Sequence, residues 1–156
     1  MEKINALINK NLKYFDFPKL GFEELTIDHD MNKFQSQKAK IENNVPCELG
    51  MYIYTNASDN KVLYVGEGNL QKRLIRHLQK IRINHSQESS RYYFFFALQI
   101  KMRVLFIKAS KIGFDKKRLQ NLECAYKLLL NPIYDQMVMK NELYQGIKLD
   151  LDKWDN

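Results

Sequence analysis

Apolar side chains recur at helical spacing at the start of the chain, and Pro18 and Gly21 then end that pattern. We therefore expect a short amphipathic helix before Pro18. The stretch 22–44 is polar and charged, and it indicates surface structure of no definite type. The composition changes at 46–50, where turn-forming residues give way to a β-rich run, so we place a domain boundary before Gly50.

Two β-rich runs, 51–55 and 61–65, flank turn-forming residues, a pattern typical of a β-hairpin with a longer loop. Successive side chains of a strand point to opposite faces. This alternation assigns four apolar residues to a core face: Met51, Ile53, Leu63 and Val65. Three tyrosines have the opposite parity: Tyr52, Tyr54 and Tyr64. The tyrosines are therefore expected to gather on one face of the hairpin.

A helix is predicted over 69–81, where Asn69 can cap the first turn and leucines at helical spacing form a buried stripe. Arg73 and His77 are neighbours one turn apart on this helix. A second row at the same spacing is basic and consists of Lys72, Arg76 and Lys80. Such a row is usually solvated surface, and contact with phosphates is the functional alternative.

The remaining pattern predicts further strands and one more helix. The runs 92–96 and 102–107 are β-rich and are expected to add one or two strands to a small mixed sheet. Asp115 can cap the next helix, which Pro132 stops. Its predicted apolar positions are Leu119, Leu122, Tyr126, Leu129 and Leu130.

Two residues of this last helix are singled out by their chemistry. Cys124 falls within the helical pattern and is expected to be a small buried hydrophobe rather than a nucleophile. Glu123 sits among the apolar positions, where a carboxylate is costly unless it finds a cation or hydrogen-bond donors. The pattern alone therefore marks Glu123 as unusual.

The composition describes one foldable domain with an extension. The chain has 156 residues, of which 45% are hydrophobic and 28% charged, as in globular rather than disordered proteins. A net charge of +7 favours an anionic partner, and nucleic acid is the commonest one. The two cysteines lie far apart, and no apolar run is long enough for a bilayer, so we expect a cytoplasmic protein with no membrane association.

The tripeptides and polar residues stand in a definite order: Gly50-Met51-Tyr52, Tyr64-Val65-Gly66, Arg73, His77, then Glu123 followed by Pro132. This ordered set resembles the GIY-YIG nuclease family, with Met51 and Val65 replacing isoleucines at positions of core parity. The resemblance covers 50 to about 135. It implies an α/β (α+β) fold with a small mixed β-sheet and flanking helices. Residues 50–156 would form the nuclease domain with a short C-terminal tail, and 1–49 an N-terminal extension, as a DNA-recognition or dimerisation arm.

The resemblance also implies a magnesium-dependent DNA endonuclease, with five catalytic residues: Tyr52, Tyr64, Arg73, His77 and Glu123. Glu123 would be the sole protein ligand of Mg²⁺, for which Mn²⁺ can substitute. Arg73 would bind the scissile phosphate. Tyr52 would help to activate water, and Tyr64 would share that duty or hold the phosphate. His77 would orient a tyrosine or relay a proton.

This sequence departs from the family pattern at several places. The link from Gly66 to Arg73 is one residue shorter than the commonest spacing, and Glu67 stands where some members have lysine. Asp135 stands near the place of a family asparagine. His85 lies where some members have another histidine, and we expect it to contact nucleic acid together with the basic row.

Two other functions remain as alternatives. The first is a catalytically inactive nucleic-acid-binding module of the same fold, and the second is an interaction protein whose tyrosines only pack. A short chain of this kind resembles restriction-type or mobile-element endonucleases. It carries one site, so duplex cleavage would need a homodimer or two successive nicks.

Overall fold

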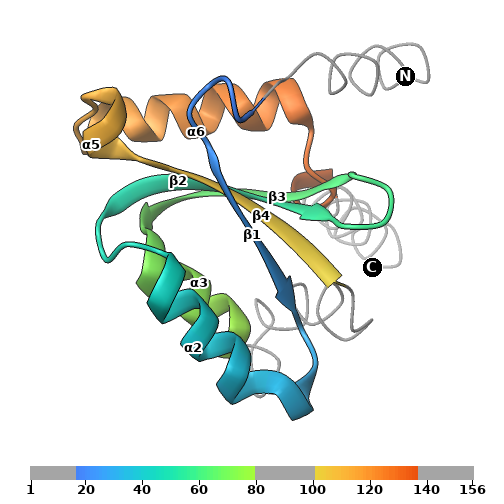
Figure 1. The fold of residues 1–156 in the computed structure, drawn as a ribbon. Helices are drawn as coiled ribbons and strands as arrows, with labels where there is room; N and C mark the ends of the chain where they lie inside the picture. Colours follow the sequence, from blue (N-terminus) through green and yellow to red (C-terminus); the bar gives the residue numbers. More distant parts are fainter. Residues whose placement is uncertain (1–16, 80–100, 137–156) are drawn as a thin grey trace, which may run out of the picture.

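The computed structural model describes residues 17–79 and 101–136, which form a four-stranded sheet with helices on both faces (Figure 1). The strands are β1 (Glu23–Asp28), β2 (Leu49–Asn56), β3 (Val62–Asn69) and β4 (Lys101–Lys108). Their order is β1-β4-β2-β3, and every pairing is antiparallel. The predicted α+β class is confirmed, but the sheet of the described residues is antiparallel rather than mixed.

The helices form two layers, one on each side of the sheet (Figure 1). On one side α2 (Phe34–Asn44) follows the short helix η1 (Met31–Lys33) and packs against α3 (Leu70–Gln79). On the other side lies α6 (Lys116–Leu130), which follows the short α5 (Ala109–Ile112). None of the helices in the described ranges has the length and apolar character needed to cross a membrane.

Side-chain alternation along β2 divides the core between these two layers. Met51 and Ile53 lie with Leu119 of α6 in one buried cluster. Tyr52 and Tyr54 point the opposite way and lie in a second buried cluster. The leucines of α3 that share this second cluster are fully buried: Leu70, Leu74 and Leu78. Both faces of the sheet are therefore hydrophobic cores, and the tyrosine face is the one that α2 and α3 cover.

The predicted β-hairpin is confirmed, but Leu63 lies on the other face from the one predicted. The pairing of β2 with β3 shifts between Tyr54 and Thr55. Tyr54 lies opposite Tyr64, whereas Thr55 lies opposite Val62, so the pairing skips Leu63. Leu63 consequently joins the tyrosine cluster, and Val62 lies in the opposite core. An extra residue of this kind breaks the alternation from which the face of Leu63 was predicted.

Residues 23–45 share the core of the strands that follow them. β1 pairs with β4, and the buried residues Ile27 and Ile41 belong to the tyrosine cluster. The polar stretch that the sequence left unassigned is thus a strand and a helix. The predicted helix before Pro18 and the predicted strand at 92–96 lie outside the described residues. A role of 1–49 as a recognition or dimerisation arm stays a prediction.

The α6 helix begins and ends as its capping residues predict. Asp115 Oδ1 accepts a hydrogen bond from the backbone N–H of Arg118 at 2.8 Å, and Asn131 ends the helix with a left-handed φ of 44° before Pro132. Two predictions of burial are wrong, because Cys124 is exposed and Leu129 is 53% exposed. Each residue turns the helix by about 100°, so positions beside the stripe that faces the sheet point to solvent.

Candidate active site

A hydrogen bond between β2 and α3 lies at the centre of the candidate site. Tyr52 Oη is 2.8 Å from His77 Nε2, and the two residues are 1% and 3% exposed. The parity of β2 turns Tyr52 towards α3. The helical period turns His77 towards the sheet, one position before the buried Leu78. The tautomer of the imidazole decides which group donates the proton.

Three tyrosines surround the ring of His77. Its centroid lies 5.6 Å from Tyr52, 5.6 Å from Tyr54 and 5.3 Å from Tyr64. Tyr52 and Tyr64 are 6.0 Å apart, which places them on one face of the hairpin, as parity predicts. Tyr134, which follows α6, meets Tyr64 edge-on at 5.2 Å. These separations are those of favourable aromatic pairs.

Two glycines of β3 make room for the polar groups of the site. A Cβ at Gly66 would lie 2.5 Å from Tyr52 Oη and 2.8 Å from Cε1 of Tyr64. A Cβ at Gly68, whose φ is +135°, would lie 2.8 Å from Nε of Arg73. Residues two apart on a strand face the same way. The exposed Arg73 is thus laid against the backbone of β3 on the side of Tyr52.

Glu67, which follows the second tripeptide, points away from this cluster. It lies opposite Met51, whose side chain belongs to the core under α6. Its Oε2 atom is buried and has no hydrogen-bond partner in the described part of the chain. A lysine at this position would therefore not lie beside the tyrosines.

Glu123 lies on α6, in the layer on the opposite side of the sheet from Tyr52 and His77. Its side chain is 16% exposed, and its Oε1 atom lies 2.9 Å from Lys127 Nζ one turn later. The carboxylate thus has the cation that its apolar neighbours require. Of the five predicted catalytic residues, the structure brings three into one cluster, places Arg73 beside it, and places Glu123 in the other layer.

The segment that follows α6 connects the two layers. Asp135 comes directly after Tyr134, which packs on Tyr64. Desolvation lowers the pKa of Lys127, but the hydrogen bond and charge of Glu123, with the charge of Asp135, outweigh it and raise that pKa. Partial burial raises the pKa of Asp135, against the attraction of Lys127. Two carboxylates therefore act on one ammonium group, next to a residue that contacts the tyrosine cluster.

The donors at this place suit a hard divalent cation. Within 17–79 and 101–136, no three His, Cys, Asp or Glu side chains form a group that could hold a metal ion. Magnesium does not require such a group, because it is commonly held by one or two carboxylates, with water and phosphate oxygens filling the other positions. Glu123 and Asp135 offer carboxylate oxygens of this type. A cation at Glu123 would have to displace Lys127 from its carboxylate.

Two of the four residues predicted to contact nucleic acid lie in the described part of the chain. Lys72 and Arg76 are exposed on α3. Lys80 and His85 lie outside the described residues, so their roles stay predictions.

Sequence reasoning missed His29, which follows β1 and contacts the cluster. Its ring lies 6.1 Å from that of Tyr54, and the residue is 1% exposed. Burial lowers the pKa of His29 to about 3, against the nearby charge of Asp28. A signal was present, because Leu25, Ile27 and His29 alternate with charged or polar residues as one face of a strand does.

Comparison of the chain with protein-family models, curated proteins and solved structures found no match. A function therefore has to be inferred from the residues and their geometry.

Proposed function

We propose that the protein is a magnesium-dependent endonuclease that hydrolyses phosphodiester bonds in DNA. The observation that carries this proposal is the buried hydrogen bond between Tyr52 and His77, within a cluster that also contains Tyr64. Packing of a hairpin on a helix does not need it, because an apolar pair would fill the space without desolvating two polar groups. The hydrogen bond holds the imidazole of His77 beside Tyr64, where it can accept a proton when a water molecule is activated.

The difference in burial supports a division of work between the two tyrosines. Tyr52 is 1% exposed and is hydrogen-bonded to His77, so it acts as a positioning residue. Tyr64 is half-buried on the edge strand of the sheet, where a phosphate or water can reach it. A phenol has an ordinary pKa of about 10, so a basic role requires nearby positive charge to favour the phenolate.

Positive charge is available on the same side, at the start of α3. Arg73 is exposed beside Gly68, and its planar guanidinium can donate two parallel hydrogen bonds to a phosphate. Lys72 and Arg76 are exposed on the same helix and would contact neighbouring phosphates. The net charge of +7 agrees with a polyanionic substrate.

Glu123 is the residue that we assign to the metal ion. A bound Mg²⁺ would polarise the phosphate and stabilise the departing oxygen. Glu123 is held half-buried by one exchangeable lysine contact, so its carboxylate is oriented before a cation arrives. Asp135 acts on the same lysine and supplies a second oxygen donor nearby.

Cleavage of plasmid DNA with Mg²⁺ or with EDTA tests the proposal. We expect Glu123→Gln to abolish cleavage while preserving folding and DNA binding, because the change removes charge and keeps the side-chain volume. Glu42→Gln is the matched control, since Glu42 forms the same type of i,i+4 pair, with Lys38 at 3.5 Å on α2.

Three outcomes would contradict the proposal in different ways. Full activity of Glu123→Gln would remove the metal role from that residue. A wild-type protein that binds DNA without cutting it would be a nucleic-acid-binding module. A protein that neither binds nor cuts DNA would be an interaction protein whose tyrosines serve packing.

A further inference from the structure

A continuous path of aromatic contacts leads from β1 to the centre of the proposed site. His29 meets Tyr54 at 6.1 Å with an angle of 60° between their rings. Tyr54 in turn meets His77 at 5.6 Å and 82°. His77 holds the Tyr52 hydroxyl at 2.8 Å. One side chain, Tyr54, therefore lies between His29 and the Tyr52–His77 hydrogen bond.

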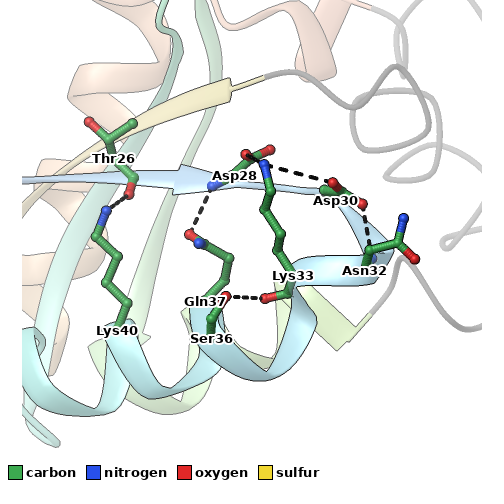
Figure 2. Close-up of polar contacts among 8 residues, drawn as sticks. All are labelled: Thr26, Asp28, Asp30, Asn32, Lys33, Ser36, Gln37 and Lys40. Atoms are coloured by element: carbon green, nitrogen blue, oxygen red, sulfur yellow. Dashed lines mark hydrogen bonds and ion pairs between the residues drawn. The ribbon is translucent and has the colours of Figure 1, made fainter.

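The backbone on both sides of His29 is fixed by polar contacts (Figure 2). Lys33 Nζ lies 2.7 Å from Asp28 Oδ2 and 3.8 Å from Asp30 Oδ2. The Asp28 backbone N–H donates to Gln37 Oε1 at 3.0 Å, and that of Asn32 donates to Asp30 Oδ1 at 2.9 Å. Such exposed ion pairs contribute little energy individually. Together these contacts connect both neighbours of His29 to the start of α2 and restrict the movement of its backbone.

The surroundings of His29 keep its ring uncharged. The residue is 1% exposed, so a protonated imidazole there would lose its hydration. The low pKa that burial imposes keeps the ring neutral near pH 7. His29 therefore presents an uncharged, polar ring to Tyr54 without adding a positive charge beside His77.

We propose that His29 is a positioning residue of the tyrosine–histidine site. Its ring fixes Tyr54, Tyr54 fixes the plane of the His77 ring, and the Tyr52–His77 hydrogen bond depends on that plane. Residues 23–45 then belong to the catalytic unit, although they precede the motifs that resemble a nuclease. This inference rests on the proposed nuclease function for its kinetic consequence, but the coupling between the two histidines can be measured independently.

The kinetic test compares His29→Ala and His29→Phe with the wild-type protein. Misplacement of a reacting group by about 1 Å can cost on the order of 100-fold in rate. We expect His29→Ala to lower kcat by about 10- to 100-fold. KM for DNA should stay nearly unchanged, because the contacts from His29 to Tyr52 run through Tyr54 and His77 and not through the exposed basic residues of α3. His29→Phe keeps an aromatic edge against Tyr54 and should restore most of kcat. Ile27→Ala is the control, because Ile27 is fully buried in the tyrosine cluster and lies on β1, the strand that His29 follows.

The structural test follows the ring nitrogens of histidine by NMR, which is practical because the chain has only three histidines. We expect the His77 signals to shift in His29→Ala and to stay in place in Ile27→Ala. If the alanine variant does not fold, His29→Leu decides, because it fills the space without an aromatic ring against Tyr54. Lowered kcat and shifted His77 signals in the folded leucine variant support the inference, and unchanged kcat and His77 signals overturn it. Unchanged His77 signals in His29→Ala overturn it as well. The inference is also overturned if kcat falls equally in Ile27→Ala and His29→Ala, once both values are corrected for the folded fraction.

These readouts separate the two proposals. A wild-type protein without cleavage activity would refute the nuclease function, while the His77 signals would still show whether His29 positions that ring. A wild-type protein that cuts DNA, with a fully active and folded His29→Ala variant, would refute the positioning role alone.

Discussion

Burial of His29 should make the stability of the fold depend on pH below neutrality. Desolvation lowers the pKa of His29 from its ordinary value of 6.5 to about 3, and the charge of Asp28 and a hydrogen bond with the Ile27 backbone oppose this only in part. The imidazole is therefore neutral in the folded protein at a pH where it is protonated in the unfolded chain. Proton binding to the unfolded chain then favours unfolding.

The expected size follows from the difference between the two pKa values. Between pH 3 and 6.5 the unfolded chain binds more protons, so the free energy of unfolding falls as the pH is lowered through 6.5. At about 1.4 kcal/mol per pH unit, the decrease is about 2 kcal/mol at pH 5 and approaches about 5 kcal/mol near pH 3. Small domains are stable by only about 5–15 kcal/mol, so a decrease of this size is readily measured.

Urea unfolding followed by circular dichroism at pH 7, 6 and 5 measures this effect in the wild-type protein and in His29→Phe. The other titrating groups are common to both proteins, so the difference between their pH dependences isolates His29. We expect the stability of His29→Phe to fall by about 2 kcal/mol less than that of the wild-type protein between pH 7 and 5. Equal decreases in the two proteins would refute the assignment of a buried neutral imidazole to His29.

Two further substitutions test the site and its basic surface. Gly66→Ala should lower the free energy of unfolding by about 1–3 kcal/mol, because the new methyl group would meet the Tyr52 hydroxyl at 2.5 Å, and cleavage should fall by more than the folded fraction explains. Gly113→Ala is its control, because an alanine there is strained by a φ of +63° but its methyl group would have nothing within 4 Å. Equal decreases of activity in the two variants would refute the steric role of Gly66. Removal of the charges of the basic row, Lys72, Arg76 and Lys80, should weaken binding to all DNA sequences alike. The slope of log binding constant against log salt concentration should become shallower by about 0.9 for each phosphate that is no longer neutralised. An unchanged slope in fluorescence anisotropy titrations would show that this row is solvated surface that does not contact DNA.

The elements that could be predicted are those whose signals are local. The hairpin was visible in two β-rich runs around turn-forming residues, and Asp115 and Asn69 marked the starts of helices because a side-chain cap acts within one turn. The strand β1 and helix α2 were not predicted, since many of their residues are polar and only a few anchor them in the core. The pairing of β1 with β4 joins segments about 80 residues apart, which no local pattern reveals.

The arrangement of the candidate site, like the fold, could be predicted only in part. Parity along a strand placed Tyr52 and Tyr64 on one face, and the ring distance of 6.0 Å confirms that placement. The helical period of α6 showed that Glu123 faces inward, and its 16% exposure agrees. Neither the alternation along a strand nor the helical repeat shows which side of the sheet a helix covers. For α6 that side depends on the connection between β4 and α6. The position of Glu123 in the layer opposite His77 therefore had to come from the structure.

This division between layers limits where the proposed chemistry can occur. Phosphodiester hydrolysis needs the activating group and the metal ligand at one phosphate, yet the sheet lies between the Tyr52–His77 pair and α6. β3 is the edge strand, and at this edge Tyr134 contacts Tyr64 while Asp135 acts on the lysine that holds Glu123. The nuclease site that we propose therefore has to lie at the rim of β3, with Tyr64 and Arg73 on one side and Glu123 on the other. Tyr64, at the rim, can then contact the substrate, and the role left to the fully buried Tyr52 is to hold His77 in place.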